Sequence, residues 1–342
     1  MIEEKSKDTK KKSFLIIRFS SIGDIVLTTP IVRALRLTYP EAKISFLVKE
    51  NFKVVIADNP LIDEILLYKN HEQTVALLMH RKWDQVIDLQ TNLRSRRLKI
   101  ALNWRKNYSS FPKLNILKWL QVQLKLKVLP KNKSIVQRYF YALRDLNIPY
   151  MPELGLEFYV AKKWELKAED IPFGHQAGYV LAVIGGSKFT KRYPIHHWQA
   201  LVKKINLPII IIGGPEDMEA AIKIKEAAPD QVYNAIGKFN LQESALLTQK
   251  AKVVIANDTG FMHIAAAYQR PLISLWGNTI PEFGMYPYYG AASKVSSIIL
   301  ETKGLSCRPC SKIGYDACPK KHFKCMELIH PDRVVEACRQ LW

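Results

Sequence analysis

The sequence contains no apolar run long enough to cross a bilayer. A membrane-spanning helix needs about 20 consecutive apolar residues, whereas the apolar runs of this chain have the length of strands. A lysine-rich start precedes Phe14 to Ile17, but Arg18 and Asp24 interrupt the apolar part and no small-residue cleavage site follows, which argues against a signal peptide. We therefore predict a disordered basic tail over residues 1–12 and a cytoplasmic protein.

Two common phosphate-binding patterns are also missing. Neither G-x-x-x-x-G-K-[ST] nor G-x-G-x-x-G occurs in the chain. The first is the phosphate loop of P-loop NTPases, and the second is the fingerprint of dinucleotide-binding domains. The sequence therefore argues against a P-loop ATPase and against a standard dinucleotide enzyme.

Acidic residues are absent between Asp88 and Asp145, although the chain has 31 of them in total. The same stretch holds fourteen Lys and Arg residues and so supplies +14 of the net charge of +20. A solvated surface normally mixes both signs of charge. This concentration of charge predicts an anionic partner: nucleic acid, anionic lipid or a multiply charged small substrate.

Short apolar runs alternate with helical patterns in two successive arrays. In the first array we expect strands at 14–19, 43–48, 65–68 and 85–89, and helices at 25–39, 52–58 and 74–81. In the second array we expect strands at 179–184, 208–212, 232–235, 253–256 and 271–276. This alternation is typical of parallel, doubly wound sheets. We predict an α/β fold of two Rossmann-like domains facing each other across a cleft, over residues 13–165 and 175–328, with a C-terminal helix over 329–342.

The segment between the two arrays contains one further periodic run. Residues 121–128 alternate strictly between apolar and polar side chains. Because a period of two is typical of a half-exposed strand, we expect a strand there, between helices at 114–120 and 136–146.

Small and polar residues follow three strands of the second array. The loops are Gly185-Gly186-Ser187, Gly213-Gly214-Pro215-Glu216 and Asn257-Asp258-Thr259-Gly260, and the last of these opens a helix. The carboxyl ends of parallel strands share one sheet edge, where ligands bind, and a helix N-terminus there attracts phosphate. These loops predict a phosphate-binding site, although Asp258 also suits the simpler role of a helix cap.

Two longer motifs resemble those of glycosyltransferase family 9, the heptosyltransferase family of bacterial lipopolysaccharide synthesis. The run from Arg18 to Pro30, RFSSIGDIVLTTP, is similar to the first motif of that family. The run from Asp258 to Ala266, DTGFMHIAA, is similar to its most recognisable motif. The segments 88–95 and 191–198 also fit, so the resemblance extends over nearly the whole chain.

The resemblance implies an inverting GT-B glycosyltransferase that needs no catalytic metal or other cofactor. It would move a sugar, with heptose from ADP-heptose as the expected donor, onto the lipopolysaccharide inner core or a related anionic glycolipid. Asp24 would be the base that takes a proton from the acceptor hydroxyl. The alternative for Asp24 is again a helix cap, because Gly23-Asp24 precedes a helical pattern.

The same resemblance assigns the remaining residues of the site. The expected donor-binding residues are Ser187, Lys191, Glu216, Asp258, Thr259, Gly260 and His263, with the loop 238–241 at the adenine. In this set Ser187, Lys191 and the Thr259 and Gly260 N–H groups would contact the diphosphate, and Glu216 the ribose. His263 either reaches the phosphates or is a buried structural histidine. The expected acceptor-binding residues are Ser20, Ser21, Gly23, Arg94, Arg96 and Arg97.

An anionic glycolipid acceptor implies a peripheral enzyme on the inner face of the inner membrane, and no nucleic-acid partner. Trp104, Phe111 and Trp119 lie among the lysines of the basic stretch. Aromatic side chains among cations suit a membrane interface. The alternative for these three aromatics is ordinary core packing.

Four of the five cysteines form a cluster near the C-terminus. Cys307, Cys310, Cys318 and Cys325 have the spacing C-x2-C-x7-C-x6-C. In a cytosolic protein this spacing indicates a structural zinc site before it indicates disulfides, and reduced thiols without a metal are the alternative.

Two other functions remain open at this point. A sugar-nucleotide epimerase can share the GT-B fold, and a nucleic-acid-binding protein would explain the charge. No recognised nucleic-acid-binding module occurs in the sequence, however.

Overall fold

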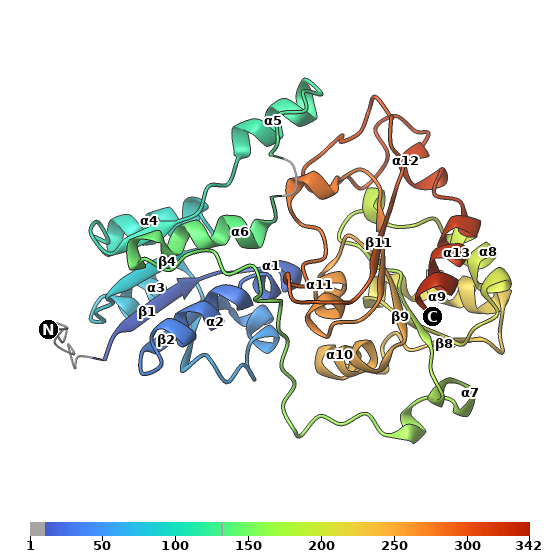
Figure 1. Ribbon diagram of the computed structural model, residues 1–342, viewed down its shortest axis with the longest axis horizontal. Coiled ribbons are helices and arrows are strands. Elements are labelled where there is room, and N and C mark those ends of the chain that lie inside the picture. Colours follow the sequence, from blue (N-terminus) through green and yellow to red (C-terminus); the bar gives the residue numbers. More distant parts are fainter. Residues whose placement is uncertain (1–10, 131–132) are drawn as a thin grey trace, which may run out of the picture.

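A computed structural model describes residues 11–130 and 133–342, which form two parallel sheets flanked by helices (Figure 1). The first sheet has the strand order β3-β2-β1-β4-β5. Its strands are β1 (Ser13–Ile17), β2 (Lys43–Lys49), β3 (Glu64–Tyr68), β4 (Gln85–Asp88) and β5 (Tyr108–Ser110). Its helices are α1 (Ile22–Val26), α2 (Thr29–Thr38), α3 (His71–Leu78), α4 (Leu93–Ala101), α5 (Asn115–Gln123) and α6 (Ile135–Tyr139), with 3₁₀ helices η1 (Glu50–Val55) and η2 (Phe140–Leu146). Most of the predicted basic tail, residues 1–10, lies outside the described residues.

The second sheet has the order β11-β10-β9-β6-β7-β8. Its strands are β6 (Val180–Val183), β7 (Ile209–Ile212), β8 (Val232–Asn234), β9 (Val253–Asn257), β10 (Leu272–Trp276) and β11 (Ser297–Glu301). Its helices are α7 (Phe173–Gln176), α8 (Ile195–Ile205), α9 (Met218–Ala227), α10 (Leu241–Lys250), α11 (Gly260–Ala267), α12 (Lys324–Glu327) and α13 (Pro331–Leu341). Short 3₁₀ helices are η3 (Ala168–Asp170), η4 (Phe189–Lys191), η5 (Pro215–Asp217) and η6 (Pro281–Phe283). The two arrays of parallel strands confirm the expected pair of Rossmann-like units.

The strand order of each sheet reverses at one point. In the first sheet the chain proceeds outward from β1 on one side and from β4 on the other, and in the second sheet β6 and β9 have the same positions. The loops after such strands diverge to opposite faces and leave a crevice in which ligands bind. The sequence motifs that follow β1, β6 and β9 therefore lie at the crevices of the two sheets.

The predicted helix over 25–39 is broken into α1 and α2. Pro30 has no N–H group to donate to the carbonyl of Val26, four residues earlier. The Thr29 hydroxyl donates to that carbonyl instead, at 2.8 Å, and the Thr28 hydroxyl donates to the Ile25 carbonyl at 2.7 Å. The break leaves α1 as a short helix beside the cleft.

The expected strand over 121–128 is wrong, because α5 extends to Gln123 and the following residues are irregular. A strand needs a neighbour for its backbone hydrogen bonds, but α5 projects away from the first sheet (Figure 1). Val122 packs instead against Ile280 and Phe283 of the second half. Tertiary contacts with the other half thus replace sheet pairing.

The chain passes from one core to the other through an extended segment. Leu156 and Phe158 are buried with the side chains of the first sheet, whereas Leu166 and Ile171 are buried with those of the second. The C-terminal helix α13 packs on the second half, where Val334 and Cys338 are fully buried.

Helices α1 and α11 approach each other at two glycines. A Cβ added at Gly23 would lie 2.6 Å from Cδ2 of His263 and 3.2 Å from Cα of Gly260. A Cβ added at Gly260 would lie 2.9 Å from the Ile22 side chain. Only hydrogen atoms at both positions allow the two helices, and hence the two halves, to pack at this distance.

We predict that Gly23→Ala destabilises the protein by about 1–3 kcal/mol, the usual cost of overpacking a core. The midpoint of urea-induced unfolding measures this change. The matched control is Gly174→Ala in α7, where an added Cβ meets nothing within 4 Å. Equal unfolding midpoints for the two variants would contradict the importance of the glycine contact.

Candidate functional site

A cavity of about 420 Å³ lies between the two halves of the molecule. It is lined by ten of the predicted site residues: Ser21, Gly23, Asp24, Ser187, Lys191, Glu216, Asp258, Thr259, Gly260 and His263. The glycine loops after β6 and β7 complete its wall on the side of the second sheet. The structure therefore brings nearly all residues of the predicted donor site, together with Asp24, around one space.

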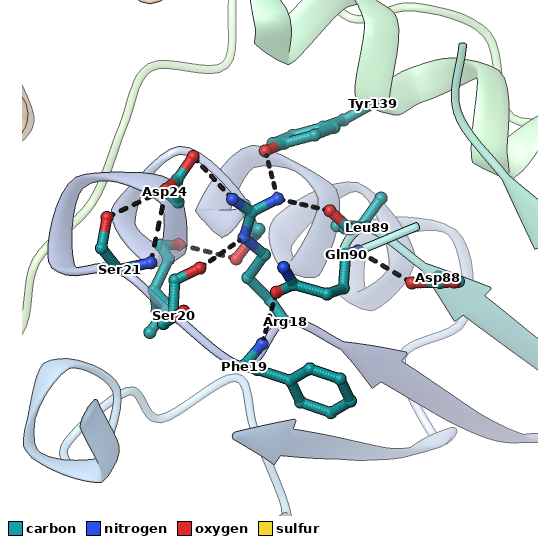
Figure 2. A network of polar contacts seen from close by, with 11 residues as sticks. Arg18, Phe19, Ser20, Ser21, Asp24, Asp88, Leu89, Gln90 and Tyr139 are labelled. Atoms are coloured by element: carbon teal, nitrogen blue, oxygen red, sulfur yellow. Dashed lines mark hydrogen bonds and ion pairs between the residues drawn. The ribbon is translucent and has the colours of Figure 1, made fainter. Parts of the chain in front are cut away.

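Arg18 organises the first-domain side of this cavity (Figure 2). Its guanidinium pairs with Asp24 at 2.6 Å and donates to the carbonyl oxygens of Ser20 and Leu89 and to the Tyr139 hydroxyl. Because Arg18 is buried and its partners come from separate segments, the network holds the loop after β1 in one position. Sequence analysis did not single out Arg18 for this role, although it begins the motif.

The Asp24 carboxylate is partly exposed to the cavity and has partners on both oxygens. Oδ1 faces Arg18, and Oδ2 accepts hydrogen bonds from the Ser21 hydroxyl at 2.9 Å and the Ser21 N–H at 3.3 Å. Burial acts to raise the pKa of Asp24, but Arg18 and the Ser21 hydrogen bonds hold that pKa below its usual value. Asp24 is therefore ionised and also caps α1, so the helix-cap role and a role in the cavity are compatible.

Lys191 and Asp258 form an ion pair of 2.6 Å at the other side of the cavity. The same carboxylate oxygen, Oδ2, also accepts a hydrogen bond from the Thr279 hydroxyl at 2.9 Å. Asp258 does not cap α11, because the N-cap is Thr259. The aspartate thus positions the Lys191 ammonium group, which retains further N–H donors for a ligand.

The N-terminal part of α11, which lines the cavity, contains polar atoms without a hydrogen-bond partner among the described residues. The N-cap Thr259 makes no side-chain capping bond, and its buried Oγ1 has no hydrogen-bond partner among the described residues. The same is true of Nδ1 of His263. Burial lowers the pKa of His263 to about 4, so the imidazole is neutral. A helix N-terminus with free donors is suited to a phosphate group.

Two buried residues that sequence analysis missed hold the loops of the second domain. Asn257 donates to the carbonyls of Ile184 and Gly185, both at 3.0 Å, and accepts from the Tyr193 N–H. Asp217 accepts from the Gly214 N–H at 2.9 Å and pairs with Arg192 at 3.2 Å. The available sequence signals were the position of Asn257 at the end of a strand and that of Asp217 shortly after the Gly213-Gly214 pair.

A second cavity of about 410 Å³ adjoins the first. Both are lined by Ser21, Asp24, Ser187, Lys191, Asp258 and Met285. The second cavity adds three lysines, Lys113, Lys118 and Lys312. Asp24 therefore lies where the two cavities meet.

Several predicted positions do not reach either cavity. Arg94, Arg96 and Arg97 are exposed on α4, and neither they nor Ser20 nor the loop 238–241 line the two cavities. Trp104 and Phe111 are buried in the first domain, so core packing is the correct interpretation for both. Trp119 on α5 is 52% exposed. The first-domain cations that line the second cavity are thus Lys113 and Lys118.

The four clustered cysteines line one small enclosed cavity of about 20 Å³. His322 lines it too, with Nε2 at 3.8 Å from Sγ of Cys307. Within the part of the chain that the structure describes, the one group of three metal-ligating atoms that converge within 4.8 Å is elsewhere, at His196, His197 and Glu327. The thiols therefore surround a common space without being drawn together. No helix of the described residues could span a membrane.

The chain is similar in sequence to known glycosyltransferases. A family model described as glycosyltransferase family 9 (heptosyltransferase) matches residues 74–314. Lipooligosaccharide heptosyltransferase 2 of Haemophilus influenzae is 25% identical over 298 residues, covering 79% of this chain and 85% of that protein.

Solved structures share the fold over nearly the whole chain. The Escherichia coli ADP-heptose lps heptosyltransferase II superposes with a TM-score of 0.70 at 19% identity, covering 96% of this chain and 98% of that one. The iron-containing dodecameric glycosyltransferase TibC of enterotoxigenic E. coli H10407 has a TM-score of 0.59 at 13% identity, covering 97% and 76%. Since the family model spans more than half of the chain, the protein belongs to glycosyltransferase family 9 and has the GT-B arrangement of two Rossmann-like domains across a cleft.

Proposed function

We propose that this glycosyltransferase transfers heptose from ADP-heptose, with inversion, onto the lipopolysaccharide inner core or a related anionic glycolipid. The observation that carries the proposal is the junction of two cavities at Asp24. One cavity has the donors for a nucleotide diphosphate, and the other is lined by cations. The heptosyltransferases named above support the choice of sugar and acceptor.

The donor binds in the cavity beside α11. The free N–H groups at the start of α11 and the Lys191 ammonium compensate the charge of the diphosphate, and Ser187 adds a hydroxyl. Glu216 is exposed at the same cavity, where its carboxylate accepts from ribose hydroxyls. Asp24, Asp258 and Asp217 are each already paired with a cation of the chain. Charge compensation by the chain's own groups supports a transfer that does not depend on a metal ion.

In the transfer step, the acceptor hydroxyl oxygen attacks the anomeric carbon as the bond from that carbon to the diphosphate oxygen breaks. ADP leaves with the electron pair of the broken bond, and Asp24 takes the hydroxyl proton. Attack opposite the leaving group inverts the anomeric carbon. An ionised aspartate with a lowered pKa is a weak base. It suffices because the proton becomes acidic as the new bond forms, so its position matters more than its basicity.

We predict that Asp24→Asn and Lys191→Ala have separable defects. Asp24→Asn loses about 10²–10⁴ in kcat, the usual contribution of a positioned base, with ADP affinity retained. Lys191→Ala weakens ADP binding roughly ten-fold or more, because a charge-assisted hydrogen bond contributes about 1.5–3 kcal/mol. Steady-state kinetics and ADP calorimetry measure the two effects.

Matched controls are Asp63→Asn, which alters an Arg-paired carboxylate on the surface, and Lys188→Ala, which removes the partner of exposed Asp316. Wild-type turnover by Asp24→Asn would remove the base from the mechanism. Unchanged ADP affinity in Lys191→Ala would remove that lysine from the donor site.

The proposed enzyme docks on the inner membrane through α5 and the residues that follow it. Exposed apolar side chains gather there: Ile116 (76% exposed), Trp119 (52%), Leu124 (55%), Leu126 (46%) and Val128 (36%). They stand in the acid-free part of the sequence, among exposed lysines such as Lys127. Apolar side chains interleaved with cations suit a bilayer that carries anionic lipid. This face borders the lysine-lined cavity, as a glycolipid acceptor requires.

We predict that the double variant Ile116→Ser/Trp119→Ser binds vesicles of mixed zwitterionic and anionic phospholipid at least ten-fold more weakly, because burying one such side chain contributes about 1.5–3 kcal/mol. Vesicle co-sedimentation measures the affinity. Phe173→Ser, at a side chain 90% exposed on the second domain, is the matched control. Equal binding by both variants would exclude α5 as the docking element.

We also propose that Cys307, Cys310, Cys318 and Cys325 hold a structural metal, with zinc as the expected ion. Four thiols around a cavity of about 20 Å³ leave space for little more than one atom-sized occupant. Thiolates suit zinc and also iron, and the neighbour TibC is iron-containing. The metal would stabilise the loop and take no part in transfer.

We predict one zinc ion per chain in the purified protein, measured by elemental analysis, and loss of that zinc in Cys307→Ser/Cys318→Ser. Cys338→Ser is the control, since Cys338 is buried in α13 away from the cluster. One iron per chain would identify the other ion. Protein that is folded and free of both metals would support reduced thiols instead.

The two alternative functions gain no support. Family membership assigns a transferase, and no structural feature favours an epimerase. The basic stretch divides between buried Arg138, cleft-lining Lys118 and exposed Arg94, so it does not form one continuous tract for nucleic acid.

A further inference from the structure

We infer that Lys113, Lys118 and Lys312 form a site for a phosphate or carboxylate group of the acceptor. The inference rests on the proposed function and deepens it, because it assigns the acceptor's charged group to three residues drawn from both domains. None of the three is among the arginines that the sequence indicated.

The three lysines line the cavity of about 410 Å³ that also contains Asp24. A molecule whose hydroxyl lies at Asp24 therefore extends directly into the space between these ammonium groups. Donor and acceptor sides are continuous, since Ser21 and Lys191 line both cavities. An anion in the second cavity is thus carried by the molecule that presents its hydroxyl to Asp24.

None of the three ammonium groups has a carboxylate partner. Among residues 11–130 and 133–342, the ion pairs within 4.0 Å involve other lysines, arginines and histidines. Lys191, by contrast, is paired with Asp258. Asp24 and Asp258 line the same cavity, but they are already paired with Arg18 and Lys191. The three ammonium groups therefore repel one another, and an anionic ligand relieves that repulsion.

Lys118 is held in place by the contact between α5 and the second domain. Its ammonium lies 5.5 Å from the centre of the Phe283 ring. One helical turn later, Val122 packs against Phe283 and Ile280. Lys113 precedes the same helix by two residues. Helix α5 thus directs cations toward the cleft while its apolar side chains Ile116 and Trp119 remain exposed.

Lys312 comes from the second domain, on the loop between Cys310 and Cys318. Hydrogen bonds order the loop around this exposed lysine, because the Ser311 hydroxyl oxygen accepts from the Ile313 and Gly314 N–H groups at 3.1 and 3.0 Å. The loop also reaches the first domain, because the Lys125 ammonium donates to the carbonyls of Cys307 and Pro309 at 3.2 and 2.7 Å. The cysteine loop therefore holds the third cation over the acceptor cavity.

Burial and neighbouring cations act together on Lys118. Burial first, and then Arg138 and Lys312, lower the pKa of Lys118 to about 7. Burial likewise lowers the pKa of Lys113. Burial thus disfavours the charged forms of Lys113 and Lys118, and a bound anion would favour those charged forms.

The test compares Lys118→Gln, Lys113→Gln and Lys312→Gln with Lys303→Gln, which alters an exposed lysine on the approach to the cysteine loop. Three acceptors are used: a heptose-free lipopolysaccharide fragment, the same fragment after dephosphorylation, and the same fragment with esterified carboxylates. We expect the KM for the intact fragment to rise about ten-fold in Lys118→Gln, as for loss of a charge-assisted hydrogen bond. The KM for ADP-heptose should not change, and Lys118→Arg should restore acceptor use.

The modified acceptors identify the anion. The fragment that lacks the recognised group should bind to the wild-type enzyme and to Lys118→Gln with equal affinity. Calorimetry of fragment binding in the presence of ADP measures these affinities without turnover. A rise in the KM for ADP-heptose instead would place the lysines at the donor diphosphate and overturn the inference. Equal losses with all three acceptors would also overturn it. Absence of transfer by the wild-type enzyme to every fragment would count against the proposed function, while the binding data would still decide the role of the lysines.

Discussion

The centre of this molecule depends on the direct contact between α1 and α11. Gly23 and Gly260 leave no space for a side chain at the crossing point. Because α1 carries Asp24 and α11 begins beside Asp258, the separation of these helices sets the distance between the two sides of the cleft. Because protein interiors are close-packed, the separation of the two helices can change very little without moving neighbouring side chains. The two motifs of the family are therefore two halves of one packing interface as well as two sets of functional groups.

Charge in the cleft is distributed unequally, and this asymmetry distinguishes its two sides. On the donor side each buried aspartate is neutralised by a basic side chain, as in the Asp258–Lys191 and Asp217–Arg192 pairs. By contrast, Lys113, Lys118 and Lys312, which line the second cavity, form no ion pair with a carboxylate of the described residues. In the proposed function, an incoming diphosphate would meet helix N–H groups and the Lys191 ammonium, whereas the acceptor would meet a cavity with unpaired positive charge.

The cysteine loop contacts segments that are far from it in the sequence. It carries Lys312, is tied to the sheet edge by the Arg308–Glu301 ion pair of 2.6 Å, and receives hydrogen bonds from Lys125 of the first domain. A metal bound by its thiols would stiffen this bridge. The loop thus contacts the edge of the second sheet, lines the second cavity and accepts hydrogen bonds from the segment that follows α5.

The sequence by itself determined the class of fold and many of the residues that line the first cavity. Strand-like runs such as 253–256 and the motif at Asp258 are local patterns, because a buried parallel strand and a helix start each have their own residue signature. Thr259 was indicated in this way, whereas Asp24 and Lys191 were expected from the resemblance of their motifs to those of the family. The sequence could not show that Asp258 pairs with Lys191 and does not cap α11. Which of the two it does depends on the side chains that the fold brings near it.

The lining of the second cavity was decided only by tertiary structure. Alternation in 121–128 has the period of a strand, yet α5 occupies part of it because the nearest partner is η6 of the other domain and not a sheet edge. Arg94 and Lys118 are equivalent as charges in a sequence, but one is on an exposed helix and the other lines the cleft. Lys312 is 194 residues from Lys118 in the numbering. No local sequence pattern predicts that these two lysines line one cavity, because their proximity results from the packing of the two domains against each other.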